Sequence, residues 1–340
     1  MRQHFAYQAL LALLLTAAFA GCQREPLPES GGAVSFSVAP VTISGEVTKA
    51  ATKADPTAKT DLIAVNNKVT VYGSYTAAGS SVALFDGVTL TCTEVSATGS
   101  TWTYSPLKYW SEDATHKFRA VFPYDVDGKS YSVADDKLSV SGYSMGGDDL
   151  MVASAQQKAA SRESNTVKLQ FRHACAAVSF QFAKAKGDTE TYSITGITLQ
   201  DVSTTGDMAD DETNPTKWTP NTTPGSSYTW TGGPWTVAES TTESPVTYTA
   251  ITPEWVFAVP QTLPSTSSLI LSYAAGTAPN VQNITVTIPL VSTNTTKIST
   301  WEPGKKYTYK VLVDPNAIRF NVEISEDWID ETKHEYEPVG

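Results

Sequence analysis

The chain has 340 residues and a formal net charge of -11 at pH 7. This acidic balance excludes a nucleic-acid-binding protein, because such proteins need a basic surface. The length allows two domains of ordinary size, and the low charged fraction of 17% fits sheets whose outer faces carry hydroxyl groups.

The first 21 residues have the pattern of a secretory signal peptide. Arg2 supplies a positive charge, an apolar run follows, and small residues end the run directly before Cys22. The run is too short for a membrane span with stable flanks. A thiol directly after Ala20 and Gly21 resembles a bacterial lipobox, which predicts cleavage after Gly21 and a diacylglycerol on Cys22. An anchor with two or three acyl chains is stable on a membrane. The alternative is an ordinary signal peptide with a chance cysteine.

A tether, a strand and a loop are predicted after the signal peptide. Residues 22–32 are polar and contain prolines, as expected of a tether. In residues 33–47, Val34, Phe36 and Val38 alternate with polar residues, which indicates a half-buried strand. Residues 48–56 repeat Thr-Lys-Ala and have no apolar face, so we expect an exposed loop that proteases can cut.

The remainder of the chain has the pattern of a β-protein. Short strand signals recur from residue 68 to 140 and again from 167 to 324, separated by Gly, Asp, Pro and Ser. Residues 203–227 read as a long polar loop, and no stretch has sustained helical periodicity. The sequence therefore predicts an all-β fold with two β-sandwich domains in tandem, residues 33–160 and residues 161–340.

Two cysteines remain after the lipidation site. Cys92 and Cys175 could form a disulfide, because an exported protein meets an oxidising compartment. They lie far apart in the sequence, and Cys175 sits in an apolar stretch. Small buried hydrophobic residues are therefore the favoured interpretation.

Motifs for catalysis, cofactors or metals are not found in the sequence. His116, His173 and His334 belong to no metal-binding or triad motif, so the chain is predicted not to be an enzyme. Asp125 to Gly128 resembles the start of a calcium loop but lacks its closing glutamate. A turn between two strands explains these residues equally well.

Four aromatic residues form a candidate sugar-stacking site. Trp218, Tyr228, Trp230 and Trp235 lie near a Gly-Gly-Pro turn, and exposed aromatic faces can stack on sugar rings. The alternative is that these side chains cap the core beneath the long polar loop, as buried tryptophans often do.

Several short blocks, taken in their order, resemble the fimbrillin family, the lipoprotein-derived subunits of type V pili. The blocks are Tyr109-Trp110, residues 118–124, Asp149-Leu150-Met151, residues 167–174, residues 259–262, residues 304–309 and Asp327-Trp328. Their simplest physical interpretation is structural: Tyr109, Trp110, Phe118 and Phe122 are expected in the core, and His173 as a satisfied strand histidine.

The resemblance implies two stacked transthyretin-like sandwiches, with the strand at residues 167–173 opening the second. It also implies that a protease removes the first strand, here residues 33–47, and leaves an apolar groove for the C-terminal strand of another subunit. On this chain the cut would follow Lys49 or Lys53. Family members often present arginine there, so the responsible protease stays open.

The C-terminal end departs from the family pattern. Residues after 328 are acidic and alternate weakly, as expected of a poor donor strand. Ile318, Phe320, Val322 and Ile324 alternate well, but they could form the last strand of the subunit's own sheet. This favours a tip or minor subunit that accepts a strand and has a role in adhesion.

The resemblance also predicts partners and a location. The partners are other pilus subunits and a surface glycan or protein, with membrane contact only through the lipid of the precursor. The precursor is expected in the outer membrane, and the mature protein in the fimbrium. The alternatives are a pilus anchor subunit, or a monomeric glycan-binding surface lipoprotein that keeps its first strand.

Overall fold

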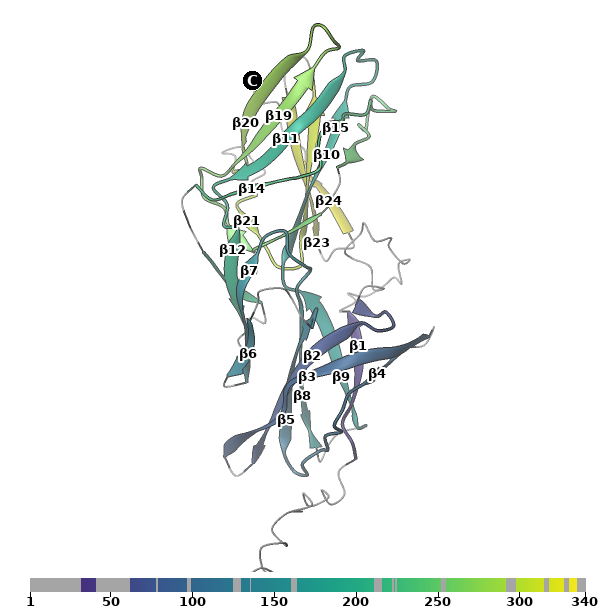
Figure 1. The fold of residues 1–340 in the computed structure, drawn as a ribbon, viewed down its shortest axis with the longest axis vertical. Helices are drawn as coiled ribbons and strands as arrows, with labels where there is room; N and C mark the ends of the chain where they lie inside the picture. The colour runs from purple at the N-terminus through teal and green to yellow at the C-terminus, as the bar shows by residue number, and fades with distance from the viewer. Residues whose placement is uncertain are drawn as a thin grey trace, which may run out of the picture.

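The computed structural model of this chain describes a defined set of residues. It covers 32–40 and 62–314, with gaps at 78, 97–98, 125–129, 135, 160–163, 211–215, 222, 224, 252–254 and 292–297, and the backbone of 318–326 and 330–334. Strands make up nearly all of the regular structure here, which confirms the predicted all-β fold. The molecule is elongated (Figure 1).

A seven-stranded sheet forms one end of the molecule. Its strands, in spatial order, are β1 (Ser35–Pro40), β9 (Thr166–His173), β8 (Met151–Lys158), β5 (Thr115–Phe122), β2 (Lys68–Ala77), β3 (Ser80–Ser96) and β4 (Gly99–Thr103). The two edge strands β1 and β4 also contact each other. The sheet therefore curves around the side chains on its inner face. Alternate apolar residues of these strands point inward and form the first core.

Strand β9 belongs to this first sheet. Its inward residues Val167, Leu169 and Phe171 lie in the first core, while the residues between them are exposed. The strand pairs with β8 and β1, which differs from the expectation that it opens the second sandwich. The sheet thus takes a strand from beyond residue 160, and the division into two domains stays a prediction.

The next sheet along the molecule has four strands, two from the first half of the chain and two from the second. Its order is β13 (Lys217–Pro220), β12 (Thr205–Ala209), β7 (Lys137–Ser144) and β6 (Ser130–Ala134). The predicted loop at 203–227 therefore contains two of its strands. Leu138, Val140, Tyr143 and Met208 are among the residues of the middle core, which lies beside this sheet.

The other end of the molecule holds three more sheets. The first contains β16 (Thr249–Ala250), β10 (Ala176–Lys184), β22 (Lys306–Val313), β23 (Ile318–Glu326) and β24 (Asp330–His334), with β17 (Val256–Ala258) also on β10. The second contains β14 (Ser227–Thr229), β11 (Tyr192–Gln200), β19 (Ser268–Ala275) and β20 (Gln282–Pro289), with β15 (Trp235–Thr236) also on β11. A small pair consists of β18 (Gln261–Thr262) and β21 (Thr300–Trp301).

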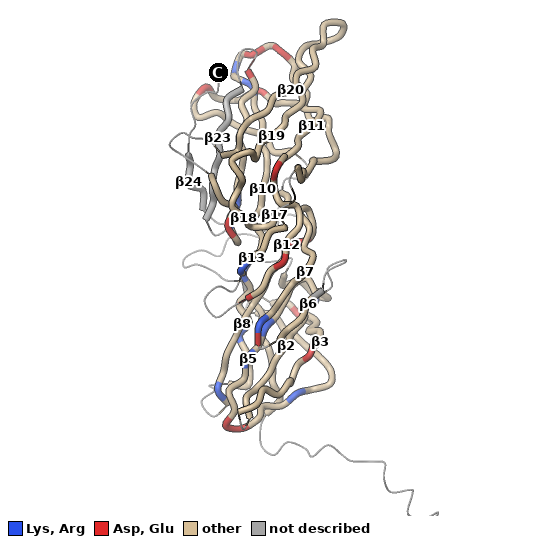
Figure 2. Tube along the Cα trace, turned by 90° about the vertical axis from the view of Figure 1, so that its left-hand side faces the viewer, with Lys and Arg blue, Asp and Glu red and all other residues tan. Residues whose placement is uncertain are grey.

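The third core fills the space between these sheets. Phe180, Tyr309, Ile197 and Leu271, from β10, β22, β11 and β19, are buried in it. Figure 2 shows few charged positions along these strands, in agreement with the low charged fraction of the sequence. Apolar side chains on one face and hydroxyl groups on the other are what a sheet with one covered face requires.

A buried carboxylate helps to join the middle sheet to the first sheet. Asp210, directly after β12, accepts hydrogen bonds from Nε of Arg119 on β5 and, at 2.6 Å, from the backbone N–H of Leu138. Nearby, the indole N–H of Trp218 donates to the carbonyl oxygen of Ala174 at 2.7 Å. These contacts join segments that are far apart in the sequence, so the halves of the chain share one framework.

The two cysteines occupy different cores. Cys92 lies in the first core and Cys175 in the middle core, and both are buried. Neither belongs to a disulfide in the described part of the chain. The interpretation as small buried residues is therefore confirmed.

Candidate functional site: the sheet edge occupied by the first strand

The predicted first strand is present as β1, at the edge of the first sheet. It runs parallel to β9, from the pair Ser35 and Thr166 to the pair Pro40 and Phe171. The sequence alternation predicted the strand but not its partner, which lies more than a hundred residues away. In Figure 1 the strand stands beside β9 and β4.

Three apolar side chains of this segment fill the first core. Val34, Phe36 and Val38 are only 1%, 5% and 4% exposed. The ring of Phe36 meets Phe85, Phe118 and Tyr104 edge to face, with centroid distances of 5.3, 5.7 and 5.8 Å. Aromatic pairs in this geometry stabilise beyond the area that they bury. Phe36 is therefore the main anchor of the strand.

Backbone hydrogen bonds hold the beginning of β1 on two sides. On one side, the N–H of Ser35 donates to the carbonyl oxygen of Asn165 at 2.9 Å. On the other, the N–H of Val34 donates to the carbonyl oxygen of Lys108 at 2.9 Å, and the Tyr104 hydroxyl donates to that of Val34 at 2.7 Å. Removing the strand would leave these groups and the backbone of β9 without partners, a state that another strand can relieve.

The residues predicted for lipidation and cleavage cannot be placed in this site. Gly21, Cys22, Lys49 and Lys53 lie outside the described residues, so their roles stay predictions. The same applies to the second part of the predicted first strand, residues 41–47, and to the loop 48–56.

The alternating segment near the C-terminal end lies in the chain's own sheet. Strand β23 pairs antiparallel with β22 from Ile318 to Ser325, and β24 pairs antiparallel with β23. Of the two possibilities left open for residues 318–324, the structure has the strand in its own subunit.

The blocks that carry the family resemblance mostly build the first core. Trp110 and Phe118 are buried there, and Phe122 packs against it. Tyr109 was expected in the core but is exposed, and its backbone forms an isolated bridge with Ala33.

Two of these blocks are in contact through a histidine and a carboxylate. Nδ1 of His173 on β9 lies 2.7 Å from a carboxylate oxygen of Asp149, two residues before the start of β8. His173 thus has the partner expected of a satisfied strand histidine, and the contact fastens the two strands at their shared end.

The four predicted sugar-stacking aromatics do not form one exposed face. Trp230 is buried in the third core, with Tyr228 edge to face at 5.0 Å, and Trp235 packs partly buried against that core. Trp218 instead lies against Tyr143 of the middle core, at a centroid distance of 5.4 Å. This arrangement favours the alternative in which these residues cap cores.

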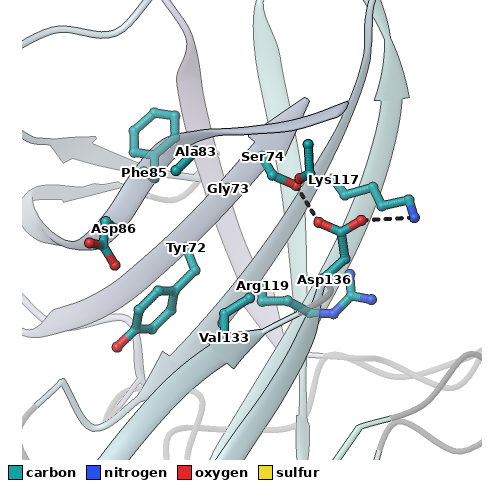
Figure 3. A pocket seen from close by; sticks show the side chains of 11 residues that line it. Tyr72, Gly73, Ser74, Ala83, Phe85, Asp86, Lys117, Arg119, Val133 and Asp136 are labelled. Atoms are coloured by element: carbon teal, nitrogen blue, oxygen red, sulfur yellow. Dashed lines mark hydrogen bonds and ion pairs between the residues drawn. The ribbon is translucent and has the colours of Figure 1, made fainter. Parts of the chain in front are cut away.

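A polar cleft lies on the outer face of the first sheet, opposite the first core. It encloses about 200 Å³ between strands β2, β3 and β5 and the hairpin of β6 and β7. Figure 3 shows Tyr72 and Asp86 on one side of it and the network of Asp136 on the other. The carboxylate of Asp136 accepts hydrogen bonds from the hydroxyl of Ser74 and, at 3.0 Å, from the ammonium group of Lys117. The sequence did not predict this cleft.

The contribution of Asp136 to the stability of the fold should depend on pH. The hydroxyl of Ser74, and then the charges of Lys117 and Arg119, hold the pKa of Asp136 below its ordinary value of 3.8. A lowered carboxyl pKa stabilises the fold above the unfolded pKa, and this contribution is lost as the pH falls through the folded pKa. We expect Asp136→Asn to unfold at lower urea than the wild type at pH 7, with the difference shrinking below pH 3.8.

Asparagine is a clean substitution there, since residue 136 has a φ of 58°, a left-handed conformation that asparagine tolerates. Asp148→Asn, at an exposed carboxylate, is the matched control. A urea difference for Asp136→Asn that stayed constant from pH 7 to pH 3 would contradict the assignment.

Helical membrane spans and metal-binding clusters are absent from the part of the chain that the structure describes. The described residues contain no helix long and apolar enough to cross a membrane. They also contain no group of three or more His, Cys, Asp or Glu side chains arranged to hold a metal ion. The segment that resembled a calcium loop, 125–128, is outside the described residues.

Comparison with known proteins agrees with the family resemblance. The solved structure of a fimbrial protein from Bacteroides vulgatus has a TM-score of 0.59 at 14% identity, over 87% of this chain and 99% of that one. Candidate cell adhesion proteins from Bacteroides uniformis and Bacteroides ovatus have TM-scores of 0.52 and 0.51, both at 13% identity. They cover 87% and 89% of this chain and 98% and 99% of their own. At these identities the likeness shows a shared fold.

Sequence comparison identifies the family. No curated protein matches the sequence. The family model described as fimbrillin-like matches residues 48–328, which is most of the chain. The chain therefore belongs to the fimbrillin-like family.

Proposed function

We propose that this protein is a pilus subunit with a role in adhesion, exported as a lipoprotein through Cys22 and displayed on the cell surface. Membership of the fimbrillin-like family supports the pilus assignment. The observation that carries the mechanism is how the first segment is held: among its described residues, Val34, Phe36 and Val38 are buried, and β1 lies at a sheet edge.

Assembly would proceed by exchange of this strand. Proteolysis in the loop at 48–56 separates β1 from the rest of the chain, and loss of β1 exposes the edge of β9 and the three apolar pockets. An extended strand from another subunit then adds to the sheet, with backbone hydrogen bonds for affinity and alternate side chains for specificity. The protein has no catalytic role in this scheme.

We infer the position in the pilus from the C-terminal strands. Because β23 is engaged in its own sheet, a donor strand would have to come from β24 and the residues after it. The sequence of β24, Asp-Glu-Thr-Lys-His, has no apolar alternation to fill such pockets. We therefore propose a tip or minor subunit that accepts a strand. An anchor subunit, which keeps β1 and its lipid, is the second candidate.

A reversible disulfide staple tests whether β1 must dissociate before another strand can bind. The side-chain oxygens of Ser35 and Thr166 are 2.8 Å apart, so cysteines at these two positions would join β1 to β9. A specific protease site is inserted between Lys49 and Lys53, and the probe is a fluorescent peptide with the sequence of residues 33–47. We expect the cut, unstapled chain to bind the peptide in fluorescence anisotropy, and the cut, stapled chain to bind it only after reduction.

The matched control is a staple far from the edge. The hydroxyl oxygens of Thr198 and Thr229 are 2.9 Å apart, between β11 and β14, and a disulfide there should leave peptide binding unchanged. Failure of the cut and reduced chain to take up the peptide, while its circular dichroism stays that of a folded β-protein, would contradict strand exchange. On the producing cell, an N-terminus at Ala50 or Ala54 in terminal peptide mass spectrometry would agree with removal of β1, whereas acylated Cys22 would favour the anchor subunit.

A further inference from the structure

The cleft on the outer face of the first sheet has the size of a site for one small ring. Its volume of about 200 Å³ is below that of pockets for drug-sized ligands, which are roughly 300–1,000 Å³. The floor is formed by β2, β3 and β5, and Val133 and Asp136 of the neighbouring hairpin form a wall. A ligand would therefore be a single ring or a short side chain.

Hydrogen-bond acceptors and donors both line this cleft. Asp86 and Asp136 present carboxylate oxygens, whereas Lys117 and Arg119 present N–H groups from neighbouring outward positions of β5. Each cation is matched by a carboxylate, Lys117 by Asp136 at 3.0 Å and Arg119 by Asp210. Such a lining can bind a ligand that both donates and accepts hydrogen bonds, and it offers little net charge to an ion.

An aromatic ring completes the lining. Tyr72 lies in the cleft beside Asp86 in Figure 3, and its hydroxyl donates to the carbonyl oxygen of Tyr131 at 3.4 Å. Burial, and then the charge of Asp86, raises the pKa of Tyr72, so the ring stays neutral at physiological pH. The electron-rich face of a tyrosine attracts the weakly positive C–H groups of an apolar ring face.

We propose that this cleft binds one uncharged sugar residue of a glycan. A pyranose has an apolar C–H face for Tyr72 and a rim of hydroxyl groups that donate to Asp86 and accept from Lys117. Because Asp86 is exposed and forms no ion pair with the described residues, an anionic sugar is disfavoured at the same place. This ligand class rests on the adhesion part of the proposed function and is independent of strand exchange.

Asp210, from the second half of the chain, fixes the position of residues around the cleft. Asp210 fixes both Arg119 and the start of β7, and β7 carries the hairpin that forms one wall. Asp210 does not line the cleft, so it is a positioning residue. Its replacement should weaken the sugar complex without removing any direct contact to the sugar.

The test measures sugar binding to the full-length chain in detergent. The probes are glucose, galactose, mannose and N-acetylglucosamine, with N-acetylneuraminate as the anionic comparison and Nα-acetyl-lysine amide as a peptide side chain. Saturation-transfer NMR should show ring-proton signals for at least one neutral sugar. Tyr72→Leu and Asp86→Asn should each weaken that binding at least tenfold.

Matched variants outside the cleft separate the site from general effects. Tyr109→Leu and Asp148→Asn change an exposed tyrosine and an exposed aspartate elsewhere and should leave the signal unchanged. No transfer to any neutral sugar, preferential binding of N-acetylneuraminate or of the lysine amide, or full binding by both cleft variants would overturn the proposal. Because the uncut chain is used, none of these outcomes bears on strand exchange.

Discussion

Replacing Phe36 by alanine is expected to lower the free energy of unfolding of the uncut chain by about 3–5 kcal/mol, the usual loss for truncating a buried phenylalanine. The substitution removes three edge-to-face aromatic contacts, with Phe85, Phe118 and Tyr104. It leaves a cavity in the first core beneath the edge strand β1. The shift of the urea midpoint, followed by circular dichroism, measures the loss.

Two comparisons make this expectation specific to the seat of β1. Tyr109→Ala, at an exposed aromatic beside the same strand, should change stability by less than about 0.5 kcal/mol. After cleavage in the loop at 48–56 and removal of the released segment, the variant and the wild type should unfold alike, because residue 36 is gone from both. A loss under 1 kcal/mol in the uncut chain would show that Phe36 is not the anchor.

Replacing Asp210 by alanine should destabilise the chain to a similar extent, by about 3 kcal/mol, because it leaves a largely buried guanidinium without its carboxylate. The side chains of Arg119 and Asp210 are 16% and 5% exposed, so solvent compensates little for the lost partner. The backbone N–H of Leu138 loses its acceptor as well. Urea unfolding at pH 7 tests this expectation.

The pair itself is tested by removing both charges. The double variant Arg119→Met with Asp210→Leu should recover much of the loss, since an apolar pair of similar volume can replace a buried ion pair. Lys117→Met, at the more exposed ion pair of the cleft, should cost clearly less, because its partners are 33% and 21% exposed. If Asp210→Ala and Lys117→Met had equal effects, burial of the Arg119 pair would not be the cause.

The local structure was largely predictable from the sequence, but the pairing was not. The alternation of Val34, Phe36 and Val38 predicted β1 correctly, because a strand with one covered face leaves a period of two in the sequence. The same alternation says nothing of which edge the strand joins. Parallel pairing with β9 depends on the curl of the whole sheet, which the local pattern does not contain.

The segment at 203–227 contains strands that its sequence did not predict. It was interpreted as a loop because it is polar, yet β12 and β13 lie in it. Among the described residues of this segment, only Met208 and Trp218 belong to or pack against the middle core, too few to produce a periodic signal. Backbone pairing with β7 sets the structure here, and a polar sequence is compatible with it.

The cleft and its support were also hidden from sequence inspection. Lys117 and Arg119 look like ordinary outward residues of an alternating strand, and Asp210 like one of many acidic loop residues. Their meeting depends on the approach of β7 and β12 to β5, which is a tertiary event. By contrast, the four aromatics singled out near residues 218–235 were recognisable but are distributed over two cores.

The parallel pairing of β1 with β9 has a consequence for the order of folding. Ser35 and Thr166 are 131 positions apart, so their contact closes a very long loop. The antiparallel strands between them close shorter loops, and contacts at low sequence separation form sooner. We therefore expect β1 to dock last, onto a sheet that is already assembled. A segment that docks last and is not needed to nucleate the rest can be removed after folding with the remaining structure intact, as strand exchange requires.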